Sequence, residues 1–92
     1  DCSDLKNWKM CYFLEKLEIY LFDFTKIEPR TFENFLNLKY LDLNSNKISS
    51  IKPDAFSSLL NLEYLNLSNN QIEEFNSDIF NGLIKLKELD LS

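Results

Sequence analysis

Apolar residues return along this chain with a fixed spacing of 24 positions. One copy of the pattern consists of Leu38, Leu41, Leu43, Asn46, Ile48, Ile51, Phe56 and Leu59. The pattern recurs one period later from Leu62 to Leu83 and one period earlier from Leu14 to Phe35, and it begins again at Leu86. A spacing of this kind predicts one structural unit that stacks on copies of itself.

Each unit opens with a short predicted strand. Apolar and polar side chains alternate at Leu41, Asp42 and Leu43, and a period of two is typical of a half-buried strand. We therefore expect the leucines to point inward, and Tyr40, Asp42 and Asn44 to point outward. Successive strands should lie side by side in a parallel sheet, about 4.8 Å apart.

The residues after each strand predict a turn and an outer return limb. Asn46 and Asn70 come directly after the strands, and an amide side chain can satisfy the backbone groups of a buried bend. Phe22 takes this position in the first copy, which we expect to turn differently. Pro29 and Pro53 suit a limb without sheet pairing because proline has no N–H group.

The return limb should carry the aromatic part of the core. Phe32, Phe56 and Phe80 occupy equivalent positions, and we expect them to stack behind the sheet. A wide limb opposite tightly spaced strands bends the array. The predicted fold class is an α/β solenoid, with a curved parallel β-sheet on the concave face and an irregular or short helical convex side.

These residues resemble the leucine-rich repeat consensus, LxxLxLxxNxIxxIxxxxFxxL. The 24-residue length with a late phenylalanine is similar to the extracellular variety, as in Toll-like receptor ectodomains, Slit, the small proteoglycans and variable lymphocyte receptors. The resemblance covers residues 14–92. We expect an N-terminal cap at 1–13, then repeats at 14–37, 38–61, 62–85 and, in part, 86–92.

Both cysteines, Cys2 and Cys11, lie in the predicted cap. Their spacing fits neither a zinc site nor a CxxC redox motif. A pair at one end is typical of a disulfide that holds a cap together, which implies an oxidising compartment. Two reduced thiols in a cytosolic protein are the alternative. The cap resembles the cysteine-bearing flank of extracellular leucine-rich repeat proteins, although four cysteines are usual there.

Size and charge narrow the classes of partner. The chain has 92 residues, enough for one domain, and a net charge of −5 without a basic cluster, so we expect no nucleic-acid binding. No stretch approaches the roughly 18 apolar residues that span a bilayer, so we expect no membrane insertion by this segment. The chain looks like an N-terminal piece of something longer. Its apolar C-terminal end invites self-association through Phe80, Leu83, Leu89 and Leu91.

Catalysis is not expected. The chain has no histidine, so it lacks the commonest general base and metal ligand. Its single glycine, Gly82, excludes a glycine-rich phosphate loop, and an open sheet gives carboxylates no closed pocket. Calcium needs oxygen ligands that wrap around the ion, which side chains on a flat sheet seldom do. We therefore predict no enzyme activity, metal or cofactor.

The outward strand positions form three rows across the predicted sheet. The first row is Lys16, Tyr40, Tyr64 and Glu88; the second row is Glu18, Asp42, Asn66 and Asp90; the third row is Tyr20, Asn44, Ser68 and Ser92. Tyrosine supplies contact area and a hydroxyl group, and acidic rows steer a basic partner. We predict a protein-binding concave face centred on Tyr40, Asp42 and Tyr64; an ordinary solvated sheet is the alternative.

One modification signal lies within this face. Asn66, Leu67 and Ser68 form an N-glycosylation sequon. A glycan there would project from the centre of the sheet and block a large partner. Binding would then shift to an edge of the sheet or to the convex side, where an apolar row recurs in register at Leu36, Leu60 and Ile84.

The resemblance implies a secreted or extracellular protein that binds a protein ligand. Our first hypothesis is an extracellular recognition module, the ligand-binding N-terminal part of an innate-immune receptor or secreted immune protein. The alternative is a structural or developmental matrix or guidance protein of the Slit or proteoglycan kind. A transmembrane span with a signalling domain beyond residue 92 would favour the first, and tandem flanked repeat blocks or glycosaminoglycan attachment sites the second.

Overall fold

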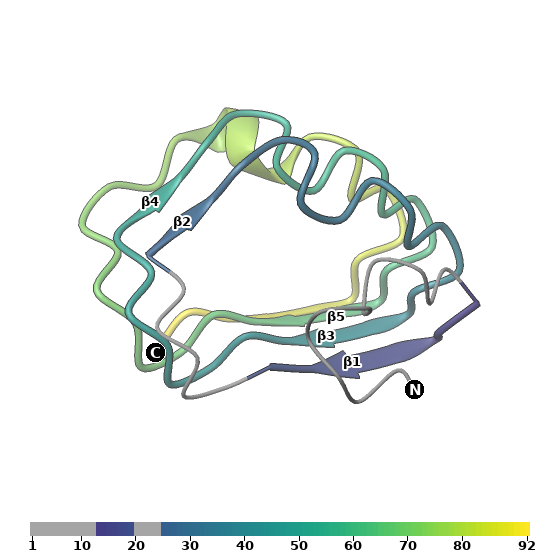
Figure 1. The fold of residues 1–92 in the computed structure, drawn as a ribbon, viewed down its shortest axis with the longest axis horizontal. Helices are drawn as coiled ribbons and strands as arrows, with labels where there is room; N and C mark the ends of the chain where they lie inside the picture. Colours follow the sequence, from purple (N-terminus) through teal and green to yellow (C-terminus); the bar gives the residue numbers. More distant parts are fainter. Residues whose placement is uncertain (1–12, 20–24) are drawn as a thin grey trace.

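The chain coils around one core, with a four-stranded sheet along one side and an irregular limb on the other (Figure 1). A computed structural model describes residues 13–19 and 25–92. The sheet contains β1 (Lys16–Glu18), β3 (Tyr40–Asp42), β5 (Tyr64–Asn66) and β6 (Glu88–Asp90). Across from it lie β2 (Lys26–Ile27), β4 (Ser50–Ile51) and the 3-10 helix η2 (Ser77–Phe80).

All strand pairs are parallel and join residues 24 positions apart. The order in the large sheet is β1-β3-β5-β6, and β2 pairs with β4 on the opposite limb. The register aligns Leu17 with Leu41, Leu41 with Leu65, and Leu65 with Leu89. The sequence period is therefore the structural period, and the predicted solenoid with a parallel sheet and an irregular outer limb is confirmed.

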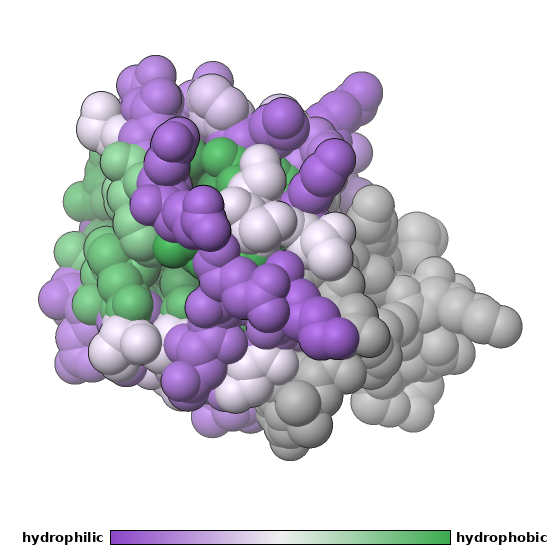
Figure 2. All heavy atoms as spheres, turned by 90° about the vertical axis from the view of Figure 1, so that its left-hand side faces the viewer, coloured by the Kyte–Doolittle hydropathy of each residue, from purple (hydrophilic) through white to green (hydrophobic). Residues whose placement is uncertain are grey.

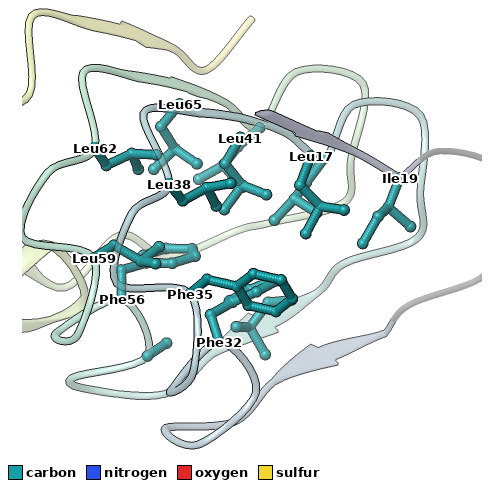
Figure 3. Close-up of a cluster of buried hydrophobic side chains, with 14 of the residues drawn as sticks. Leu17, Ile19, Phe32, Phe35, Leu38, Leu41, Phe56, Leu59, Leu62 and Leu65 are labelled. Carbon is teal, nitrogen blue, oxygen red and sulfur yellow. The ribbon is translucent and has the colours of Figure 1, made fainter. Parts of the chain in front are cut away.

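The inward leucines and phenylalanines fill the coil (Figure 3). Leu41, Leu65, Phe32 and Phe56 are fully buried, and burying side chains of this size is worth roughly 1.5–3 kcal/mol each. Phe32 and Phe56 stack with ring centroids 6.0 Å apart, as predicted. Phe80 packs against the core but stacks instead on Phe75, at 6.5 Å. That final part of the predicted spine is therefore wrong.

The asparagine turns connect each repeat to the one before it. Asn46 Nδ2 donates to the carbonyl oxygens of Leu43 in its own repeat, at 2.9 Å, and of Ile19 in the preceding one, at 2.8 Å. Asn70 Nδ2 repeats this arrangement with Leu67 and Leu43, both at 3.0 Å. As predicted, the two amides therefore satisfy backbone carbonyls at the bends, and they do so in two successive repeats.

Several predictions fall on residues outside the described ranges. These are the cysteine pair, nearly all of the cap at 1–13, and two aromatic positions of the first repeat: Cys2, Cys11, Tyr20 and Phe22. The cap and the repeat boundaries stay predictions. Within residues 13–19 and 25–92, no helix has the length and apolar character that crossing a membrane requires.

The last strand is covered less well than its neighbours. Leu89 in β6 is 39% exposed, whereas Leu41 and Leu65 at the same register position are 0% exposed. Leu91 and Phe75 are exposed as well. Figure 2 views the molecule from the left-hand side of Figure 1. Hydrophobic surface gathers toward the left of this view. Self-association of the 92-residue chain through this end stays a prediction, and a monomer in light scattering at high concentration would contradict it.

Candidate functional site

The centre of the first row is a pair of stacked tyrosines. The ring centroids of Tyr40 and Tyr64 are 4.3 Å apart and their planes differ by 15°. The parallel register makes this stacking direct, because it places the two residues side by side on adjacent strands. Both side chains are half-buried. The sheet therefore presents a pre-ordered aromatic surface to solvent.

Opposite charges lie at the two ends of this pair. Lys16 Nζ is 4.7 Å from the centroid of the Tyr40 ring, within the range of a cation–π interaction. The same ammonium is 3.8 Å from Glu18 Oε1. At the other end, the register aligns Tyr64 with the exposed Glu88. Along the sheet, the first row therefore consists of a cation, two rings and an anion.

A hollow of about 330 Å³ opens beside the second ring. It is lined by Tyr40, Glu63, Tyr64, Lys87 and Glu88. Lys87 Nζ is 3.4 Å from Glu63 Oε1, so one carboxylate of the hollow already has a cationic partner. Glu88 makes no ion pair within the described residues. The hollow therefore carries an excess negative charge next to an aromatic ring.

Sequence reasoning missed the residues just before each strand. Glu15, Lys39, Glu63 and Lys87 stand 24 positions apart with alternating charge. The structure pairs Lys39 with Glu15 at 3.7 Å and Lys87 with Glu63 at 3.4 Å. The same period that revealed the leucines could have revealed this row. Exposed pairs of this kind add at most about 1 kcal/mol, so what matters here is that Glu63 and Lys87 line the hollow.

The second and third rows bond to each other at the strand ends. In each of three repeats, a second-row Oδ1 accepts hydrogen bonds from the residue two positions later. The backbone N–H donates at 2.8–3.0 Å and the side chain at 2.6–2.8 Å. The pairs are Asp42 with Asn44, Asn66 with Ser68, and Asp90 with Ser92. These are Asx-type turns, in which the side chain serves its own backbone.

This geometry corrects the predicted exposure of two residues. Asp42 is 8% exposed and Ser68 is 6% exposed, although the alternation in sequence predicts that both face solvent. The Asp42 carboxylate folds onto its turn instead of extending from the sheet. Glu18, in contrast, keeps 47% of its side chain exposed. The centre of the candidate surface is therefore the tyrosine pair, without Asp42.

The ionisation of two groups is shifted by these contacts. Partial burial, then the Tyr64 hydroxyl and the negative charges of Asp42 and Glu18, raise the pKa of Tyr40. A tyrosine phenol is already neutral at physiological pH, and this shift keeps it protonated, and able to donate a hydrogen bond, to a higher pH. Hydrogen bonds from Ser92 lower the pKa of Asp90, which keeps that carboxylate ionised at the end of β6.

Asn66 has one amide atom engaged and one free. Its Oδ1 accepts both bonds from Ser68, whereas Nδ2 has no hydrogen-bond partner in the described part of the chain. The residue is half-buried in β5. No three Asp, Glu, Cys or His side chains within residues 13–19 and 25–92 are placed to hold a metal ion.

The sequence and the fold match known proteins. The family described as leucine rich repeat matches residues 14–72 and 46–92. A chain in the crystal structure of the TLR13–ssRNA13 complex is 44% identical and superimposes with a TM-score of 0.83. The match covers 87% of the present chain and 11% of the TLR13 chain, so the present chain spans a small part of that protein's length. No curated protein gives a match.

Proposed function

The chain belongs to the leucine-rich repeat family, and on that premise we propose that it is an extracellular recognition module that binds a polypeptide through the first row. Its similarity to TLR13 supports a place in the ligand-binding part of an innate-immune receptor or secreted immune protein. The proposed role is binding without catalysis. The carboxylates of the described rows lie on an open sheet or at its strand ends, whereas acid–base catalysis by carboxylates is usually built in an enclosed pocket.

One observation carries the proposal: the Tyr40–Tyr64 stack, with its 4.3 Å ring separation. In the three later repeats, the second-row side chains Asp42, Asn66 and Asp90 instead bond to their own turns. The first-row tyrosines do not bond to a turn in this way, and their rings keep aromatic area at the surface. Tyrosine loses little conformational entropy on binding, and two stacked rings lose less still because they are already ordered.

The charge of the face favours a basic polypeptide over a nucleic acid. The TLR13 structure is a complex with ssRNA13, so RNA is the natural competing ligand. Phosphate binding needs lysine and arginine contacts. The first two rows here contain Glu18, Asp42, Asp90 and Glu88, against the single cation Lys16. The exposed carboxylates among them, Glu18 and Glu88, repel phosphates and attract cationic side chains.

A retention experiment tests the proposal. The 92-residue chain is immobilised and exposed to extracellular fluid, alongside a Tyr40→Ala/Tyr64→Ala variant. We expect the wild type to retain a polypeptide that the variant loses, because the variant removes both rings. A Lys52→Ala/Glu28→Ala variant is the matched control: it also carries two substitutions, but at exposed positions beside β2 and β4.

Two outcomes would overturn the proposal. The first is equal retention by the wild type and the tyrosine variant, with both folded by circular dichroism. The second is saturable binding of single-stranded RNA that the tyrosine variant abolishes, which would make the face a nucleic-acid site. We expect no RNA retention at physiological salt.

An extracellular location goes with two covalent modifications that we also propose: a disulfide between Cys2 and Cys11, and a glycan on Asn66. The Asx turn uses only Oδ1 of Asn66, so a glycan on Nδ2 leaves both of its hydrogen bonds intact. Mass spectrometry of material from eukaryotic cells should show a modified Asn66 peptide. With the glycan present, a large partner has to approach the tyrosine pair from the start of the strands.

A further inference from the structure

We propose that the hollow beside Tyr64 is a site for a guanidinium group, filled by an arginine side chain of the partner. The site would lie between the free face of the Tyr64 ring and the Glu88 carboxylate. The proposal deepens the proposed function and rests on it, because it names the group through which a basic polypeptide would be recognised.

The position of the site is set by the strand order. β5 lies between β3 and β6, so Tyr64 has Tyr40 on one side and Glu88 on the other. One face of the Tyr64 ring is covered by the stack with Tyr40. The other face is directed toward a strand whose residue in register carries no ring. The hollow of about 330 Å³ lies here, with Tyr64 and Glu88 among its lining residues.

The opposite end of the row shows what this arrangement accepts. The outer face of the Tyr40 ring has the Lys16 ammonium 4.7 Å from its centroid, and Glu18 Oε1 lies 3.8 Å from that ammonium. A cation there touches a ring face and a carboxylate together. At the Tyr64 end the ring and the carboxylate of Glu88 are both present, and no described cation occupies the ring face. The hollow therefore offers an external cation the same two kinds of group, a ring face and a carboxylate, while its own cation, Lys87, is paired with Glu63.

The charges around the hollow favour a cation from outside the chain. Glu63 and Glu88 contribute two carboxylates, and the only ammonium lining the hollow in the described structure, Lys87, is held by Glu63 at 3.4 Å. Glu88 is left without a counter-charge among the described residues. A planar guanidinium can stack on an aromatic face and donate two hydrogen bonds to a carboxylate, whereas an ammonium acts as a point charge.

Titration with single amino-acid probes tests the site directly. N-acetyl-arginine amide is added to the 92-residue chain while the Tyr64 ring and Glu88 amide resonances are followed by nuclear magnetic resonance. We expect saturable shifts at both groups. Glu88→Gln should weaken binding by roughly fivefold, the size of one partly exposed charge contact. Glu28→Gln changes the net charge equally on the opposite limb and should leave the affinity unchanged.

Further probes separate the components of the site. Tyr64→Phe keeps the ring face and should keep the binding, whereas Tyr64→Leu should lose it. N-acetyl-citrulline amide has the shape of arginine without its charge, and we expect it to cause no saturable shift. Equal binding by citrulline, or tighter binding by N-acetyl-lysine amide, would overturn the guanidinium assignment. The absence of any arginine shift in a folded chain would overturn the site itself.

The result for the site is separable from the result for the proposed function. If the tyrosine variant loses a polypeptide partner while arginine amide shifts nothing, the recognition face stands and the guanidinium site is wrong. If arginine amide binds beside Tyr64 but no polypeptide depends on the tyrosines, the site stands and its proposed use in recognition is wrong.

Discussion

The first and last residues of each strand in the large sheet are two positions apart and lie on the same face. Their side chains nevertheless make different kinds of contact. The first row stacks Tyr40 on Tyr64 and leaves the rings accessible from solvent. The second row folds its oxygens onto the next residues of the chain, and this buries Asp42. Residue type alone would rank the acidic second row as the better site for a basic partner. In the structure, however, Asp42 is buried and the tyrosine rings remain at the surface, which is why we propose the tyrosines as the site.

The path of the backbone just after each residue explains the difference. Two positions after Asp42 the backbone has left the sheet, and the N–H of Asn44 takes the Asp42 carboxylate as its acceptor in place of a neighbouring strand. Two positions after Tyr40 the chain is still in β3, where the neighbouring strands serve the backbone. A polar side chain at a strand end is therefore drawn to its own turn, and one at a strand start remains available.

The largest expected effect is on the buried asparagine turns that follow the strands. Asn46→Ala removes a buried amide whose Nδ2 serves the carbonyls of Ile19 and Leu43. We expect a loss of about 3 kcal/mol in the free energy of unfolding, since each buried group left unsatisfied costs roughly 1–3 kcal/mol. The urea midpoint should fall with little change in slope.

Asn61→Ala is the matched control for this prediction. Asn61 Nδ2 also bridges to the preceding repeat, donating to the Leu36 carbonyl at 2.8 Å, but this contact is exposed. Water can replace it, so we expect a loss below about 1 kcal/mol. Equal losses in the two variants would mean that burial of the amide is not what stabilises the turn.

A smaller effect separates the charge of the second row from its hydrogen bonding. Asp42→Ala removes the acceptor for Asn44 and should cost about 1.5 kcal/mol of stability. Asp42→Asn keeps an oxygen at the same place, as Asn66 does one repeat later, and should unfold close to the wild-type midpoint. Its affinity for a basic partner should also be unchanged. Weaker binding by this folded variant would return Asp42 to the binding site.

The fold was predictable because the same pattern of apolar residues recurs in every repeat. Apolar positions 24 residues apart define both the register and the buried face, and the alternation around Leu41 identifies the strand. Such patterns state which side of a strand a residue occupies. They say nothing of how far a side chain reaches from that side.

The site was predictable only in part for that reason. The first row could be read from alternation and register. The burial of Asp42 depends on a bond to the residue two positions later, and the signal was present: an Asp or Asn with Asn or Ser two positions on, in three successive repeats. The contribution of Glu63 and Lys87 to the hollow depends on side-chain conformations, which no sequence period specifies.

A double-mutant cycle measures whether the tyrosine pair acts as a unit. Tyr40→Leu, Tyr64→Leu and the double variant should give a coupling free energy of about 1 kcal/mol, because stacked aromatic pairs contribute roughly 0.5–1.5 kcal/mol beyond the area they bury. A cycle between Tyr40 and Glu88 is the control. These residues lie on strands that are not adjacent and should couple by less than about 0.5 kcal/mol. Similar coupling in both cycles would contradict a specific stack.

The smallest effect is on the titration of Tyr40, which connects the two rows. Burial, the Tyr64 hydroxyl and the charges of Asp42 and Glu18 raise its pKa, so folding favours the protonated phenol. The stability that this contributes is present below the unfolded pKa of about 10 and is lost as the pH rises through the folded pKa. Ultraviolet titration of tyrosinate should show a late-ionising component that Tyr40→Phe removes. Glu18→Gln should lower the pKa of that group slightly, since it deletes only the last and smallest of these causes. A wild-type curve in which Tyr40 ionises at or below its ordinary value would mean that solvent screens the stack from its neighbours, and that the first row is more open than its ring contact implies.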